Sequence, residues 1–238
     1  MPSLRALGLG LIMLLQVATA SPLAKRAVAA PDCTPPTVTK STGPAPALPL
    51  TGGATELPST NVTLQIVAIG RGIQNYTCSA VGAVPVQLGA VATLYDATAL
   101  AWTDLALLHT IPPIIVTKPL PPGYLAQSGQ HFDVIGHHFF DSAGTPTFIL
   151  SEATPPRAGF MAKTASVSAP AGASKGPAGT GAVAWLDLTN KPGYVQENVT
   201  QVYRVETAGG NSYPNCTSIG VQSVQYAAEY WFYDPNPN

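Results

Sequence analysis

Charge is what this sequence has least of. Charged residues make up 10% of the 238 residues, while 46% are hydrophobic; ordinary globular chains carry about 25% charged residues. Disorder would need low hydrophobicity, so the shortage of charge does not indicate it. The sequence also has no basic stripe, which removes the electrostatic argument for binding nucleic acid or an anionic membrane.

Cysteine is scarce as well, with only Cys33, Cys78 and Cys216. In an oxidising compartment three cysteines predict one disulfide and one remaining thiol. The sequence leaves three pairings open. We favour Cys78–Cys216, because Cys33 lies in a Pro-rich segment.

Long helices are not expected, since the chain has 24 prolines and proline breaks helix interiors. Short apolar runs between turn residues predict an all-β fold, a single antiparallel β-sandwich or barrel-like domain with one short helix and long loops. The helix is expected within residues 98–109 and a loop over 119–129. The strands are expected at 64–69, 73–79, 84–89, 90–96, 114–116, 130–140, 145–150, 159–168, 182–189, 199–207 and 221–233.

The N-terminal residues predict export. Residues 1–20 combine Arg5, an apolar stretch and the small-residue pattern Ala18-Thr19-Ala20, as in a signal peptide. The apolar stretch is too short for a membrane span. Lys25-Arg26 ends a possible propeptide, residues 21–26, and removal of Arg5, Lys25 and Arg26 changes the net charge from −1 to −4.

The remaining chain divides into a Pro/Thr-rich extended arm, residues 27–60, and a β domain, residues 61–238. Residues 48–50 of the arm could pair as an edge segment. Four N-glycosylation sequons follow, at Asn61, Asn75, Asn198 and Asn215. Together with the signal peptide they predict a glycoprotein that is secreted and resides outside the cell or in the cell wall.

Several short sequence patterns occur in a fixed order between residues 64 and 233. They are Gly72-x-Gln74-x-Tyr76-x-Cys78, Ala92-Thr93-Leu94-x-Asp96, Gly136-x-His138-Phe139-Phe140, Trp185-Leu186-x-Leu188, Val202-Tyr203-Arg204-Val205-x-Thr207-x-Gly209-Gly210 and Tyr226-Ala227-Ala228-x-Tyr230-x-Phe232-Tyr233. In this order they resemble a family catalogued as domain of unknown function 3455, found in secreted fungal proteins and in bacteria. Its members are often labelled malate dehydrogenase.

The residues do not support that label. A nicotinamide site needs a glycine turn that opens a helix. Gly70-Arg71-Gly72, which we expect to form a turn between two strands, is followed by β-forming residues and lacks a third glycine. We therefore expect no cofactor.

The chain carries no pattern typical of nucleophilic catalysis, and we assign no catalytic residue. The candidate ligand-binding residues are Gln74, Tyr76, His138, Lys163, Trp185, Arg204 and Tyr230. Arg204 is expected to need an acidic partner such as Glu206 or Glu229. Aromatic residues on one face of 221–233 could stack on sugars, unless both faces are buried. This favours a binding or structural module, with polysaccharide or another cell-surface component as its partner.

The alternative is a secreted hydrolase or a metal-dependent enzyme that uses His131, Asp133 and His138. His131, Asp133 and His137 share one face of a predicted strand. However, a strand rises about 3.3 Å per residue, which separates the two histidines by about 20 Å. We therefore expect no metal site.

Overall fold

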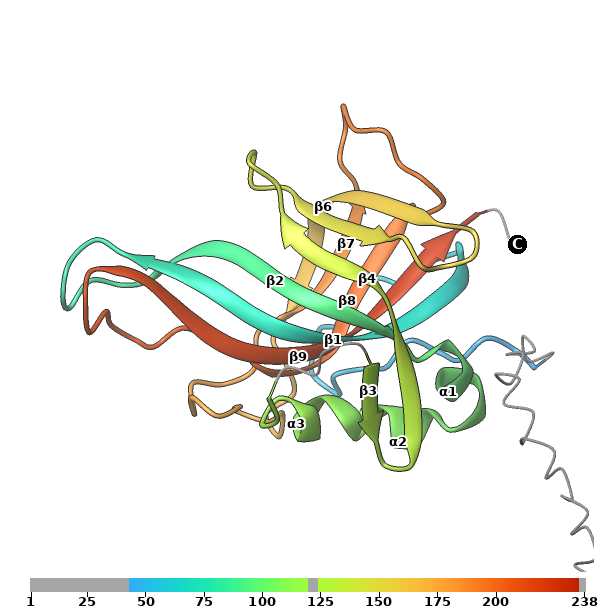
Figure 1. Ribbon diagram of the computed structural model, residues 1–238, viewed down its shortest axis with the longest axis horizontal. Helices are drawn as coiled ribbons and strands as arrows, with labels where there is room; N and C mark the ends of the chain where they lie inside the picture. Colours follow the sequence, from blue (N-terminus) through green and yellow to red (C-terminus); the bar gives the residue numbers. More distant parts are fainter. Residues whose placement is uncertain (1–42, 120–123, 236–238) are drawn as a thin grey trace, which may run out of the picture. The chain divides into compact units, whose positions relative to one another are not determined.

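The computed structural model describes residues 43–119 and 124–235. Within these residues the chain forms nine strands and three short helices (Figure 1). They are β1 (Thr63–Cys78), β2 (Val86–Asp96), α1 (Thr98–Thr103), α2 (Leu105–His109), α3 (Ile111–Ile115), β3 (Tyr124–Gln127), β4 (Gln130–Phe140), β5 (Pro146–Leu150), β6 (Arg157–Val167), β7 (Trp185–Asn190), β8 (Gln201–Gly209) and β9 (Gly220–Asp234).

The strands form one antiparallel sheet that closes on itself. Its order is β2-β1-β9-β8-β7-β6-β5-β4-β3, and β2 pairs in addition with β4, residues 92–95 against residues 134–138. Strand β3 stays outside the closed part, because it pairs with the first four residues of β4. The predicted all-β antiparallel domain is confirmed, in its barrel-like form.

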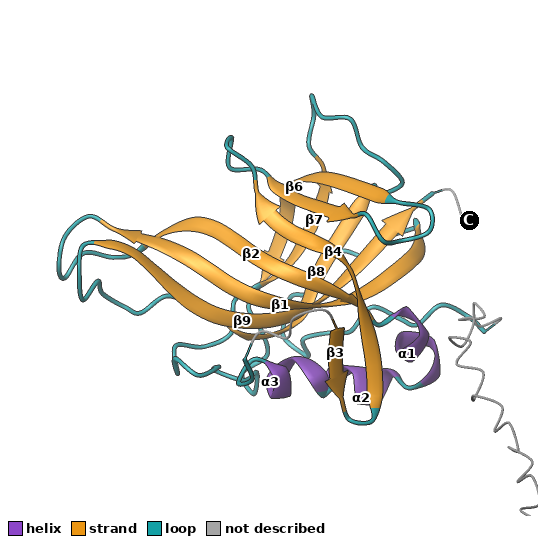
Figure 2. Ribbon diagram, viewed as in Figure 1, coloured by secondary structure: helices purple, strands orange, loops and turns teal. Residues whose placement is uncertain are grey.

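The two faces of the sheet bury different side chains. One apolar cluster takes residues from all eight strands of the closed part, including Leu94, Phe148 and Tyr230, and lies on the interior face of the sheet. A second cluster lies outside, where Leu100, Leu108 and Ile111 of the helices cover the sheet. Figure 2 shows the three helices gathered on one side of the strands. Because side chains alternate along a strand, neighbouring residues serve opposite clusters.

The predicted Gly-Arg-Gly turn is wrong: residues 70–72 lie inside β1, a single 16-residue strand. The two glycines allow close packing instead of a turn. A Cβ on Gly70 would overlap the ring of Tyr230, and a Cβ on Gly72 would overlap the carbonyl oxygen of Val91.

Arg71 ties this strand to the helices. Its side chain is 1% exposed and donates to the carbonyl oxygens of Ile115 and Lys118, at 3.0 and 2.8 Å. The strand predicted at residues 114–116 is wrong, since these residues are the end of α3 and its C-cap.

Four further expectations were wrong. Three short helices replace the one expected within residues 98–109, and β3 lies within the expected loop 119–129. Residues 84–89 and 90–96 form largely one strand, β2. Residues 48–50 form no strand, although Leu48 packs against the outer cluster. The predicted signal peptide, the dibasic site and Cys33 lie outside the described residues.

Candidate functional site

Five of the seven candidate ligand-binding residues converge on the interior face. Gln74 pairs with Ala90 of the interior cluster, and Tyr76 follows on the same face of β1. Arg204 of β8 lies directly opposite Tyr230 of β9. His138 stacks on Phe148, with ring centroids 4.2 Å apart, and lies 5.6 Å from the Tyr230 ring.

The other two candidates lie elsewhere. Trp185 is 1% exposed and belongs to the outer cluster, so it cannot share a ligand with the interior group. Lys163 is exposed. It pairs with Leu188 of the interior cluster, which places it on the interior face at an accessible position.

His138 is a neutral interior histidine. It is 3% exposed, and its Nδ1–H donates to the carbonyl oxygen of Thr147 at 2.9 Å. Burial lowers the pKa of His138 to about 4, and the charge of Arg204 acts in the same direction. His138 is buried in the interior and His131 is exposed. These two histidines of the alternative enzyme site therefore do not lie together.

Arg204 has no acidic partner among the described residues, contrary to the expectation that Glu206 or Glu229 would provide one. Its guanidinium donates through Nε and Nη2 to the carbonyl oxygen of Ala184, at 3.3 and 2.8 Å. Neither ion pair in the described part of the chain includes it. Glu229 cannot reach it, because residue 229 points to the opposite face of β9 from Tyr230.

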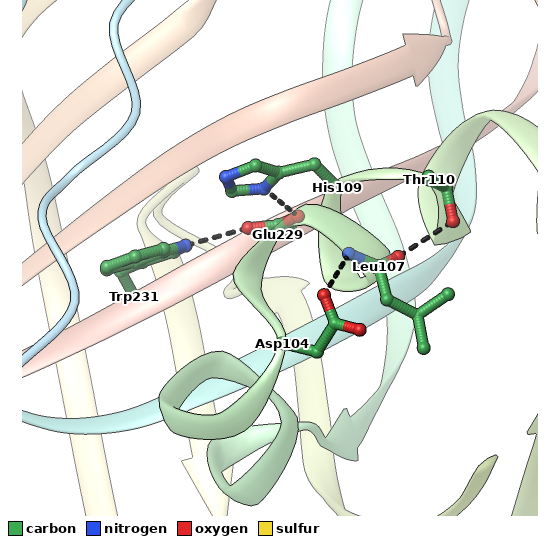
Figure 3. A network of polar contacts seen from close by, with 6 residues as sticks. All are labelled: Asp104, Leu107, His109, Thr110, Glu229 and Trp231. Carbon is green, nitrogen blue, oxygen red and sulfur yellow. Dashed lines mark hydrogen bonds and ion pairs between the residues drawn. The ribbon is translucent and has the colours of Figure 1, made fainter.

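Glu229 instead forms a buried network with a helix that covers the sheet. The carboxylate is 0% exposed and lies 2.9 Å from Nδ1 of His109 at the end of α2. Trp231 Nε1–H donates to its second oxygen at 3.0 Å. Figure 3 shows the side chains of His109, Glu229 and Trp231 together. It also shows the start of α2, where the Asp104 carboxylate accepts a hydrogen bond from the backbone N–H of Leu107.

The network favours the protonated form of His109 by raising its pKa. Burial acts to lower the pKa of His109, but the hydrogen bond and the charge of Glu229, together with Glu206, outweigh it and raise the pKa. Burial, and then Glu229, raise the pKa of Glu206. For both groups the stabilisation is therefore present at low pH and lost as the pH rises through the raised values. Sequence reasoning missed this site, because nothing in the pattern at His109 points to residue 229.

The candidate cleft lies between α1 and β4. It has a volume of about 320 Å³, and its polar lining consists of Asp96, Gln130, His131, Asp133 and Glu152. Its apolar lining includes Leu100 and Phe132. His131 Nε2 lies 3.0 Å from Asp133 Oδ1. The cleft therefore contains two of the three residues of the alternative enzyme site, His131 and Asp133, but His138 does not line it. Lys and Arg are absent from the lining, which leaves the cleft acidic.

The aromatic residues of β9 form no exposed platform. Tyr226, Tyr230, Trp231, Phe232 and Tyr233 are all between 0 and 5% exposed. Of the two interpretations left open by the sequence, the buried one is confirmed. A sugar-stacking surface on this strand is ruled out.

The described residues contain two of the three cysteines and all four sequon asparagines. Cys78 and Cys216 form a disulfide, as predicted. Asn61, Asn198 and Asn215 are exposed, and Asn75 is half-buried, with its Oδ1 accepting from the Ser223 hydroxyl. Among the described residues no three His, Cys, Asp or Glu side chains are placed to hold a metal ion. No helix in the same part is both long and apolar enough to cross a membrane.

The fold and the site define an antiparallel closed-sheet domain with a polar interior end, a helix-covered outer face and an acidic cleft. The chain belongs to the family described as Protein of unknown function (DUF3455), whose family model matches residues 58–234. No curated protein and no solved structure matches the chain. Gly70-Arg71-Gly72 lies inside a strand and opens no helix, so this segment provides no dinucleotide site of the kind that the malate dehydrogenase label implies.

Proposed function

We propose that this protein is a secreted, N-glycosylated binding module of the cell wall or extracellular space, and that its acidic cleft binds a polysaccharide containing amino sugars. The observation that carries the proposal is the composition of the cleft between α1 and β4. It joins three carboxylates, an amide and a histidine to an apolar floor. This is the general composition of ligand sites in proteins, where a few polar groups set specificity on an apolar surface.

Charge selects the class of sugar. Asp96, Asp133 and Glu152 accept hydrogen bonds from hydroxyl groups, and they attract the ammonium group of an amino sugar. The cleft has no Lys or Arg to neutralise them. A deacetylated, positively charged polymer should therefore bind more tightly than its neutral counterpart.

Two observations support the extracellular part of the proposal. The disulfide joins the end of β1 to the segment before β9, and structural disulfides persist in oxidising compartments. Three of the four sequons carry an exposed asparagine, which is compatible with an attached glycan.

Retention on insoluble polysaccharides tests the proposal. The purified protein should be retained on chitosan more strongly than on chitin, glucan or cellulose, and added salt should weaken the retention. Asp133→Asn combined with Glu152→Gln should reduce retention on chitosan at least about tenfold, since two charged contacts are lost. Glu197→Gln, which neutralises an exposed acid outside the cleft, is the matched control and should bind as the wild type does. Equal retention of the cleft variant and the control would overturn the proposal.

A further inference from the structure

At the end of the interior that holds Arg204, the described residues place a positive charge with no carboxylate paired to it. Arg204 is 8% exposed. Its guanidinium donates to the carbonyl oxygen of Ala184 and forms a hydrogen bond with the side chain of Tyr230, but no carboxylate among the described residues pairs with it. The groups around it, Tyr76, His138, Tyr226 and Tyr230, are neutral at ordinary pH. A buried cation without an opposite charge is strongly unfavourable. Something outside the chain would therefore be expected to supply the negative charge.

The other two buried arginines of the described residues, Arg71 and Arg157, are better supplied with acceptors or a nearby carboxylate. Arg71 donates to four backbone carbonyl oxygens, those of Gly72, Ile115, Lys118 and Tyr226, and also to the side chain of Gln225. Arg157 lies at the other end of the interior, where the charge of Asp234 raises its pKa against the effect of burial. Of the three buried arginines in the described residues, only Arg204 lacks both a set of carbonyl acceptors and a nearby carboxylate.

Hydrogen-bond donors are in excess at the same place. Gln74 is 0% exposed, and its Nε2 has no partner, while its Oε1 accepts from Gln87 Nε2 at 3.1 Å. The hydroxyls of Tyr226 and Tyr230 lie 2.9 Å apart; one donates to the other, which leaves one hydroxyl proton to donate elsewhere. Buried donors of this kind normally have a protein, water or ion partner.

These side chains lie close together. The side chains of Gln74 and Tyr226 both flank Gly210, whose carbonyl oxygen accepts from the Tyr76 hydroxyl at 2.6 Å. Burial raises the pKa of Tyr76, Tyr226 and Tyr230, and the charge of Arg204 opposes the rise at all three. Arg204 is therefore close enough to act on the whole group.

Three residues on the interior face are not fully buried. Lys163 is exposed, and Phe140 and Leu186 are half-buried. Lys163 adds a second positive charge on this face. Charged groups of one sign raise the local concentration of ions of the other sign.

We propose that the interior of the closed sheet binds the carboxylate of a small organic acid at Arg204, with Gln74 and the Tyr226–Tyr230 hydroxyl pair as further donors. A carboxylate fits because one negative charge balances the one buried positive charge, and because its two oxygens match the planar donors of a guanidinium. This site is separate from the acidic cleft and does not depend on the cleft's function.

Titration with acetate and benzoate, at constant ionic strength in chloride, tests the site. Binding to the folded protein alone raises its melting temperature in a saturable way, and benzamide, the neutral counterpart of benzoate, should have no such effect. Arg204→Met should weaken benzoate binding at least about 30-fold, as expected when one partner of a buried charged pair is removed. Gln74→Leu should weaken it roughly tenfold.

Arg157→Met removes the buried arginine at the other end and is the matched control, which should bind benzoate as the wild type does. Should Arg204→Met fail to fold, Arg204→Lys keeps the charge but not the planar donors, and should bind benzoate measurably more weakly. An unsaturable response of the wild type, an equal response to benzamide, or unchanged binding in the Arg204 variant would each overturn the proposal. None of these results bears on chitosan retention, so the two proposals can fail separately.

Discussion

Single side chains in this protein behave according to the face on which they lie. Tyr230 and Glu229 are neighbours on β9, yet one faces Arg204 inside the sheet and the other faces His109 outside it. The alternation of side chains along a strand is the cause. The acidic residues nearest to Arg204 in sequence therefore cannot neutralise it, and the buried carboxylate meets a histidine of a helix instead.

At the residue scale, His138 should make the protein sensitive to acid. The pKa of His138 is about 4 in the folded state and about 6.5 in the unfolded chain, which therefore takes up the proton first. Between pH 7 and pH 4 this difference should lower the free energy of unfolding by about 3 kcal/mol. Urea unfolding of the wild type and of His138→Gln over this range measures it.

Between pH 7 and pH 4, the free energy of unfolding of His138→Gln should fall by about 3 kcal/mol less than that of the wild type. His137→Gln changes an exposed neighbour and should keep the wild-type pH dependence. An equal acid loss in His138→Gln and the wild type would contradict the assignment of a neutral interior histidine.

Among the elements, β1 connects most of the structure. It pairs with β9 along nearly its whole length and with β2 over residues 68–77, and Arg71 fixes the end of α3 to it. Glycine inside a strand usually weakens it, but here Gly70 and Gly72 let Tyr230 and β2 approach the backbone closely.

Gly72→Ala should therefore disturb the pairing of β1 with β2. The new methyl group would overlap the carbonyl oxygen of Val91, and backbone shifts of this kind cost about 1–3 kcal/mol or more. Thermal unfolding and amide hydrogen exchange of β2 measure the effect. Gly172→Ala, at a position with nothing within 4 Å of the added methyl group, is the control, and a loss of stability as large as that of Gly72→Ala would argue against the packing explanation.

For the whole molecule, the closure of the sheet depends on contacts between distant parts of the chain. Strands β1 and β9 lie side by side although they are separated by most of the domain. The disulfide Cys78–Cys216 holds the same two regions together, across a sequence separation of 138. It should therefore stabilise the fold mainly by restricting the unfolded chain.

Replacing Cys78 and Cys216 together by serine should lower the free energy of unfolding by about 2–5 kcal/mol. Guanidinium unfolding with and without reductant measures this difference. Reductant should weaken the wild type to about the level of the double variant and should leave that variant unchanged. Cys33→Ser should match the wild type, and loss of the disulfide in that variant would contradict the pairing.

The sequence by itself determined the β class, most strand positions and the family, because alternation, turn residues and short motifs are local properties of the chain. It favoured the disulfide Cys78–Cys216 but left three pairings open, and the structure decided between them. The sequence also identified Gln74, Tyr76, His138, Arg204 and Tyr230 as candidates, but not that they converge. The tertiary structure alone decided the closure of the sheet, the burial of both faces of β9, the pairing of His109 with Glu229 and the acidic cleft. Each of these features depends on which distant strands and helices pack together, and the local spacing of residues does not predict such contacts.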